Sequence, residues 1–207
     1  MNLTEHTIHG FLEALRSPNP TPGGGSASAL AGAAGASLLA MVAGLPKSRA
    51  VTVEDLERLK AAGERCTALA VDLEALVQRD SDAYDMVLAA YRRPKGTEDE
   101  KNARAAAIQS AFRAAIAAPL EVMRACAAGA EQAVVVATLG LASASSDVQV
   151  GVELLGAALR GAKLNVETNL GSVKDQEYLA EVRADVVEYE RAIGHEASAA
   201  VRALSRT

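Results

Sequence analysis

The first residues that could do chemistry lie in a proline- and glycine-rich segment near the amino terminus, Thr21-Pro-Gly-Gly-Gly-Ser26. Gly23, Gly24 and Gly25 leave their backbone N–H groups clear of side chains, and Ser26 is expected to be the N-cap of the helix that follows. Free N–H groups at a helix start favour the close approach of a planar or anionic ligand. The plain alternative is a flexible loop before a tightly packed helix.

A second candidate is the acidic segment Asp80-Ser-Asp-Ala-Tyr-Asp85. Asp82 and Asp85 are three residues apart and share a helical face, while Asp80 and Tyr84 form an i, i+4 pair. Carboxylates this close repel one another, which suits them to proton transfer if they are recruited to a site. A solvated acidic patch is the alternative.

The segment Tyr91-Arg-Arg-Pro-Lys95 carries three cations after the acidic segment. They could hold an anionic substrate tail, or they could simply complement the dipole at a helix carboxyl terminus.

The last candidates follow an uncharged stretch that runs from Gln132 to Ser146. Asp147 is expected at a helix start, where the dipole favours a charged carboxylate in dry surroundings; a helix-capping role alone is the alternative. Asn165 and Asn169 lie four residues apart on one face of the same helix. Amides placed there need partners from the backbone, another helix or a ligand.

The elements that must position these residues are helices. The 207-residue chain is 50% hydrophobic, with 3% aromatic residues and no Trp, so its core must be built from Ala, Leu and Val, which favours closely packed helices. We expect one all-α domain over residues 1–207, with six or seven helices and no sheet. The expected helices cover residues 3–15, 26–44, 52–91, 97–139 (kinked or divided at Pro119), 146–170 and 175–204, and the Ala/Gly-rich helix at 26–44 is the buried central one.

Composition also argues against several classes of function. The net charge is −5 with both signs interspersed, which does not fit a nucleic-acid surface. The apolar run 26–45 is too rich in Ala, Gly and Ser for a membrane span, and the amino terminus lacks a basic signal region, so the cytoplasm is the expected location. Cys66 and Cys126 are expected to be buried and reduced, and His6 and His9 lack the further ligands of a metal site.

In their order along the chain these segments resemble one family, the cyclodeaminase/cyclohydrolase family of folate enzymes. It includes the carboxy-terminal half of formiminotransferase-cyclodeaminase and stand-alone methenyltetrahydrofolate cyclohydrolases. The motifs that carry the resemblance are Thr21-Pro-Gly-Gly-Gly-Ser26, Asp82-Ala-Tyr-Asp85 with Tyr91 and Pro94-Lys95, Ser146-Asp-Val-Gln-Val-Gly151, and Gly161-Ala162 through Leu164-Asn165-Val166 to Asn169-Leu170. One departure is Leu141, where the family commonly has Asn after the glycine.

The resemblance implies an all-helical homodimer that acts on the carbon between N5 and N10 of a tetrahydrofolate derivative, with no cofactor beyond that substrate. A separate formiminotransferase is a candidate partner. A cyclodeaminase closes the bridge and expels ammonia, whereas a cyclohydrolase opens it with water. The segment 146–151 favours formiminotetrahydrofolate cyclodeaminase; the alternatives are methenyltetrahydrofolate cyclohydrolase and a non-catalytic helical scaffold.

The resemblance also suggests roles for particular residues. Asp82 and Asp147 are expected to transfer protons and stabilise a cationic amidinium, and Lys95 to assist the departing group or hold the substrate. The expected substrate-binding residues are Pro22, Gly23, Gly24, Gly25, Ser26, Asp85 and Asn165. Contacts with a glutamate tail are expected from Lys47, Arg49, Arg92 and Arg93.

Overall fold

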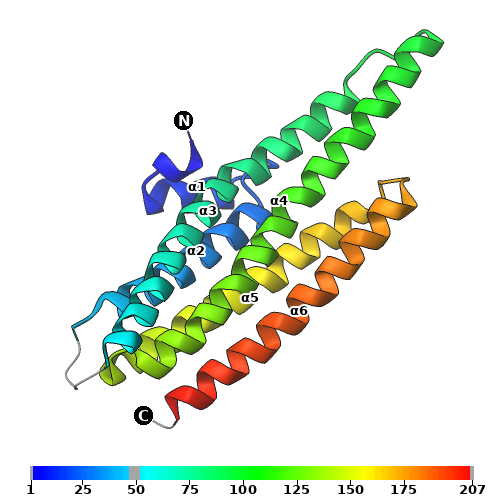
Figure 1. Ribbon diagram of the computed structural model, residues 1–207. Coiled ribbons are helices and arrows are strands. Elements are labelled where there is room, and N and C mark those ends of the chain that lie inside the picture. Colours follow the sequence, from blue (N-terminus) through cyan, green and yellow to red (C-terminus); the bar gives the residue numbers. More distant parts are fainter. Residues whose placement is uncertain (1, 47–51, 206–207) are drawn as a thin grey trace.

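The computed structural model describes residues 2–46 and 52–205, and every regular element within them is helical (Figure 1). The expectation of an all-α protein is therefore confirmed. Lys47 and Arg49 lie outside the described residues. The elements are η1 (Leu3–Glu5), α1 (Ile8–Arg16), α2 (Gly24–Gly44), α3 (Val53–Tyr91), α4 (Glu98–Leu139), η2 (Ala142–Ala144), α5 (Ser145–Leu170) and α6 (Gln176–Leu204).

Most helix boundaries follow from capping residues that are visible in the sequence. Thr52 caps α3 by accepting the Asp55 N–H, and Thr97 with Glu100 forms the expected capping box of α4. The expected first helix is instead split into η1 and α1, because the Thr7 side chain caps α1 by accepting the Gly10 N–H. Pro119 does not divide α4, which continues through it to Leu139.

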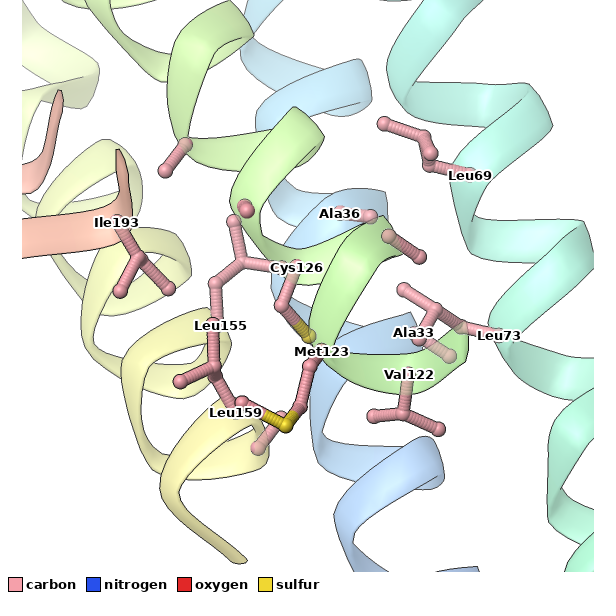
Figure 2. Close-up of a cluster of buried hydrophobic side chains, with 14 of the residues drawn as sticks. Ala33, Ala36, Leu69, Leu73, Val122, Met123, Cys126, Leu155, Leu159 and Ile193 are labelled. Atoms are coloured by element: carbon pink, nitrogen blue, oxygen red, sulfur yellow. The ribbon is translucent and has the colours of Figure 1, made fainter. Parts of the chain in front are cut away.

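The long helices lie lengthwise against one another, and the α3–α4 hairpin extends beyond the rest (Figure 1). Helix α4 packs against α2, α3, α5 and α6, so it joins the two sides of the bundle. Figure 2 shows its Met123 and Cys126 side chains inside a cluster with Leu155 and Leu159 of α5. The core is apolar throughout this cluster, as the composition predicts.

The small residues of α2 let it approach its neighbours closely. A Cβ built at Gly35 would lie 2.8 Å from the carbonyl oxygen of Gly151, so the backbones of α2 and α5 are in direct contact. Helices α2 and α4 are long and apolar enough to span a membrane by length and composition alone. In α2 only 39% of that apolar window is buried inside the chain, and Leu30 and Met41 are 43% and 45% exposed. One side of the Ala/Gly-rich helix is therefore uncovered.

Both cysteines are buried free thiols, as expected. Burial raises the pKa of Cys66 and of Cys126 to about 12, so both stay protonated at neutral pH. They act as small apolar side chains of the core.

Candidate active site

A cavity of about 370 Å³ lies at the amino-terminal end of α2. Helices α3, α4 and α5 supply most of its walls, and the loop that leads into α2 completes it. Its lining residues are Pro20, Thr21, Gly23, Gly24, Gly25, Asp80, Tyr84, Val87, Phe112, Ala115, Asn165, Thr168 and Asn169. The volume is in the range of small-molecule sites, and a few polar groups converge on apolar walls, as in such sites generally. We call it the α2 pocket.

The amino terminus of α2 is capped by a carboxylate from another helix. Gly23 is the N-cap and offers no side chain, so α2 begins two residues before the expected Ser26. The prediction that Ser26 is the N-cap is therefore wrong. Its hydroxyl donates across the helix interface to the Val77 carbonyl at 2.8 Å and lies 3.3 Å from Asp80 Oδ2. Asp80 also accepts the backbone N–H of Ser26, which is the bond that an N-cap side chain ordinarily makes.

Gly25 is required by this arrangement. A Cβ built there would lie 2.0 Å from Asp80 Oδ1, far inside van der Waals contact. The absence of a side chain at position 25 therefore lets the Asp80 carboxylate sit against the first turn of α2.

Asp80 is the half-buried carboxylate of the α2 pocket. Burial raises the pKa of Asp80, and the hydrogen bonds from the side chain and backbone of Ser26 oppose that rise. A carboxylate with a raised pKa can accept and return a proton nearer neutral pH than an exposed one. The same group is also suited to stabilise a cation that enters the pocket.

Two amides of α5 face the same pocket. A Cβ built at Gly24 would lie 3.7 Å from Asn165 Nδ2, which donates to the Gly161 carbonyl at 2.9 Å. Asn169 Nδ2 donates to the carbonyls of Ala115 and Asn165. Backbone groups thus satisfy the amide nitrogens, while neither Oδ1 atom has a recorded partner within residues 2–46 and 52–205. These oxygens are available to accept hydrogen bonds from a ligand.

The other wall of the pocket is apolar. Val87 of α3 and Phe112 and Ala115 of α4 form it, and the Tyr91 ring meets Phe112 edge to face with centroids 6.2 Å apart. A flat ring system could lie against this wall with its polar edge toward the amides and Asp80.

Asp82 and Asp85 do not line the pocket. Residues two and five positions after Asp80 are rotated by about 200° and 140° around the helix, so they point to other sides of α3. Both are exposed, and Asp82 Oδ1 accepts a 2.7 Å hydrogen bond from Gln78, whose own oxygen accepts the Leu3 N–H. Asp82 therefore belongs to a surface network under η1.

Asp147 is remote from the pocket within one chain, and Lys95 does not line it. Asp147 is in the first turn of α5, as expected, but Asn165 follows eighteen residues later, which corresponds to about 27 Å along the helix. Lys95 is exposed in the α3–α4 connection, beyond Tyr91. Pro22 is buried next to the pocket and has a cis peptide bond with Thr21. The predicted roles of Asp82, Asp85, Asp147 and Lys95 stay predictions.

Of the predicted site residues, the structure brings together Gly23, Gly24, Gly25 and Asn165 around Asp80, with Ser26 directly behind them. Asp80 itself was not among the expected catalytic residues. A signal for it exists in the sequence, because Asp80 continues the buried stripe of Leu69, Leu73 and Leu76 toward Val87. A charge on an apolar helical stripe needs a partner or a function.

A second hollow offers less chemistry than the α2 pocket. The hollow between the end of α2 and the beginning of α3 has a volume of about 510 Å³, but its Lys60 and Glu64 pair with each other at 3.7 Å. Among the described residues there is also no group of three or more His, Cys, Asp or Glu that could hold a metal ion.

Comparisons with known proteins agree on one family. Residues 7–188 match the family model described as formiminotransferase-cyclodeaminase. A methenyltetrahydrofolate cyclohydrolase of Methylorubrum extorquens is 40% identical over 175 residues, which cover 84% of each chain. The formimidoyltransferase-cyclodeaminase of Sus scrofa is 32% identical over 186 residues, which cover 88% of this chain but only 34% of that protein.

A solved structure gives the same fold. The crystal structure of a formiminotetrahydrofolate cyclodeaminase from Thermotoga maritima superposes with a TM-score of 0.86 over 97% of this chain and 96% of that one, at 23% sequence identity. The resemblance stated from the sequence motifs is therefore confirmed over most of the chain. The chain belongs to the formiminotransferase-cyclodeaminase family.

Proposed function

We propose that the chain is a folate enzyme that acts on the one-carbon bridge between N5 and N10 of tetrahydrofolate, and that its primary activity is methenyltetrahydrofolate cyclohydrolase. The observation that carries the chemistry is the half-buried Asp80 carboxylate at the start of α2, in a pocket with one apolar wall and two amides. The choice of activity is supported by the relative from Methylorubrum extorquens, which this chain matches over 84% of both lengths.

The substrate of this reaction carries a positive charge on the N5–C–N10 unit. Asp80 would stabilise that charge, because it is a carboxylate in a partly dry site. It would then accept one proton from the water that attacks the bridging carbon, and return that proton to N5 as the C–N5 bond breaks. The remaining hydroxyl proton leaves to solvent as the formyl carbonyl forms, so the reaction releases one proton overall. The product is the 10-formyl compound. General acid–base help of this kind contributes about 10²- to 10⁴-fold to a rate.

The remaining residues of the pocket would position the substrate. The pterin ring would lie against Val87 and Phe112, and the Oδ1 atoms of Asn165 and Asn169 would accept its N–H groups. Gly24 and Gly25 would let the ring approach the backbone of α2. We propose no cofactor beyond the folate itself.

The second candidate is formiminotetrahydrofolate cyclodeaminase. It is favoured by the segment Ser146–Gly151, which looks like the deaminase halves of the bifunctional enzymes. In that reaction N10 attacks the formimino carbon and ammonia leaves, so a proton must reach the departing nitrogen. Asp80 is placed to shuttle it in the same pocket. A separate formiminotransferase would then be a partner, because this chain spans only a third of the pig protein.

The alternative of a non-catalytic helical scaffold depended on Leu141, which stands where the family commonly has Asn. Leu141 packs against the core next to η2, near the end of α5 that lies farthest from the α2 pocket. Its apolar side chain therefore does not remove a polar group from the pocket.

The absorbance of methenyltetrahydrofolate tests the proposal directly. Purified protein without added metal or cofactor is expected to accelerate the loss of this absorbance, and Asp80→Asn should abolish the acceleration. Appearance of the absorbance from the formimino substrate, with ammonia release, would assign the deaminase activity instead. If neither reaction is catalysed and calorimetry detects no folate binding, both proposed activities are wrong and the protein is a non-catalytic scaffold.

A further inference from the structure

Two buried hydroxyl groups lie directly behind the Asp80 carboxylate. Within the described part of the chain the buried polar side chains are three serines, Ser26, Ser28 and Ser81. The Oγ atoms of Ser26 and Ser81 are 3.2 Å apart, and neither residue lines the α2 pocket. The Ser28 hydroxyl instead donates to the Gly24 carbonyl of its own helix at 2.7 Å. Ser26 and Ser81 thus form a hydroxyl pair that joins α2 to α3 in a buried place, where each hydrogen bond is strong.

The Ser26 hydroxyl has more acceptors than protons. Its Oγ lies 2.8 Å from the Val77 carbonyl oxygen and 3.3 Å from Asp80 Oδ2. A hydroxyl group carries one proton, so Ser26 donates fully to one of these two oxygens at a time. Neither a carbonyl nor an ionised carboxylate can donate in return, so Ser81 supplies the proton for its 3.2 Å contact with Ser26. The two hydroxyls therefore form a short chain with one direction, from Ser81 through Ser26 to the carbonyl or the carboxylate.

The direction of the Ser26 proton depends on the charge of Asp80. An ionised carboxylate is a stronger hydrogen-bond acceptor than a carbonyl, so it attracts the proton of Ser26. Once Asp80 is protonated this advantage is lost, and the Val77 carbonyl at 2.8 Å becomes the better acceptor. Rotation about the Cβ–Oγ bond exchanges the two acceptors while Oγ stays where it is. Both protonation states of Asp80 can thus be accommodated without repacking the interface of α2 and α3.

We propose that Ser26 is a positioning residue for Asp80, and that its hydroxyl turns toward the carboxylate when Asp80 is ionised and toward the Val77 carbonyl when Asp80 holds a proton. Ser81 donates to Ser26 Oγ in both states and keeps that oxygen in place. No proton leaves Ser26: the proton that Asp80 takes comes from the attacking water, and it goes on to N5. The catalytic part of this inference rests on the proposed folate activity, whereas the hydrogen-bond switch does not.

Hydrogen bonds, rather than neighbouring charges, favour the ionised form of Asp80. Among the described residues that line the pocket, the titratable ones are Asp80 and Tyr84 of α3, and α2, α4 and α5 contribute none. The hydroxyl and the backbone N–H of Ser26 are the groups that oppose the effect of burial on the pKa of Asp80. The missing side chain of Gly25 lets the carboxylate reach both of them. Removal of the hydroxyl should therefore be felt directly in the titration of Asp80.

The switch can be tested without substrate by carboxyl ¹³C NMR of aspartate-labelled protein, with Asp80→Asn identifying the resonance of Asp80. Ser26→Ala should raise the titration midpoint of Asp80 by about one pH unit, or tenfold in proton affinity, because the charged form loses a hydrogen bond. Ser26→Cys keeps a weaker donor of similar shape and should fall between the wild type and Ser26→Ala. Ser28→Ala, the same change at a buried serine of the same helix, is the matched control and should leave the midpoint in place. An unmoved midpoint in Ser26→Ala, or an equal shift in Ser28→Ala, would overturn the proposal.

A double variant tests the role of Ser81. Ser81→Ala should shift the midpoint of Asp80 by less than Ser26→Ala does. In the Ser26→Ala background it should cause no further shift, because Ser81 acts through the hydroxyl of Ser26. Additive shifts in the double variant would show that Ser81 acts independently and would overturn the chain of two hydroxyls.

Kinetics connect the switch with the reaction. With methenyltetrahydrofolate as substrate, the acid limb of kcat/KM should rise in Ser26→Ala by as much as the NMR midpoint rises. KM at higher pH should change by less than about threefold, since Ser26 does not line the pocket. An acid limb that stays in place while the midpoint moves would overturn the catalytic part of the proposal. A wild-type protein without activity would instead refute the proposed function, and the NMR titrations would still decide the hydrogen-bond switch.

Discussion

The two sides of α3 hold carboxylates of opposite character, although they are only two residues apart in sequence. On the pocket side, Asp80 is shielded from water, bonded to Ser26 and pressed against Gly25. On the other side, Asp82 is exposed and accepts a hydrogen bond from Gln78, its neighbour one turn earlier. Both carboxylates belong to the same acidic segment, residues 80–85. What distinguishes them is the helical period, which directs one side chain to the bundle interior and the other to solvent.

The sharpest test of this comparison is to neutralise each carboxylate in turn. Asp80→Asn is expected to lower kcat by about 10²-fold or more, because the group that we propose moves the proton is lost. Asp82→Asn should change kcat by less than about threefold, since a surface side chain is rarely coupled to chemistry. Stopped-flow loss of methenyltetrahydrofolate absorbance measures both. Equal losses of kcat in the two variants would contradict a functional difference between Asp80 and Asp82.

The two adjacent glycines provide a matched pair of smaller perturbations. Gly25→Ala drives a methyl group into the Asp80 carboxylate, so it should cost about 1–3 kcal/mol of stability and roughly tenfold in kcat/KM. Gly24→Ala meets Asn165 Nδ2 only at 3.7 Å and should leave stability nearly unchanged. Thermal unfolding and steady-state kinetics of both variants check this. A Gly25→Ala protein with normal rates would mean that Asp80 can retreat without cost.

The raised pKa of Asp80 gives the pocket side its own pH dependence. If Asp80 is the base, the acid limb of kcat/KM should lie above the ordinary Asp pKa of about 3.9, and it should be unchanged in Asp82→Asn. An acid limb at the value of an exposed carboxyl would remove Asp80 from the role of base.

The free energy of unfolding should depend on pH in the opposite direction to kcat/KM. Between the ordinary pKa and the raised one, the native state binds more protons than the unfolded state, so the free energy of unfolding falls as pH rises through this window. Asp80→Asn should remove that fall and be as stable as the wild type, or more so, at neutral pH. Urea unfolding of both proteins at several pH values measures the difference. A wild-type stability that rises through the same window more steeply than that of the variant would contradict the sign.

The smallest effect is expected at the tip of the α3–α4 hairpin. Lys95→Ala should change kcat/KM by less than about threefold, because Lys95 is exposed and does not line the α2 pocket of its own chain. A larger loss with polyglutamylated substrate alone would place the glutamate tail at the hairpin, and a larger loss with every substrate would place Lys95 in the site.

Helix boundaries were largely predictable, because caps such as Thr52, Thr97 and Asp175 act locally. The role of Ser26 was not, since its partners Val77 and Asp80 come from a helix more than fifty residues away. The remoteness of Asp147 from Asn165 was in principle readable, because eighteen residues of one expected helix fix their separation. What sequence spacing alone did not reveal was the pocket itself, which exists only where α2 begins partway along its neighbours.

The contact between Gly25 and Asp80 constrains how this family can change over time. A side chain at position 25 would meet the Asp80 carboxylate, whereas the glycine leaves room for it. We therefore expect an order of descent: a lineage that gives up the proposed Asp80 chemistry should lose the carboxylate first and fill the glycine afterwards. Relatives with a side chain at position 25 should lack the acid at position 80, so these two residues together should mark which descendants keep the proposed Asp80 chemistry.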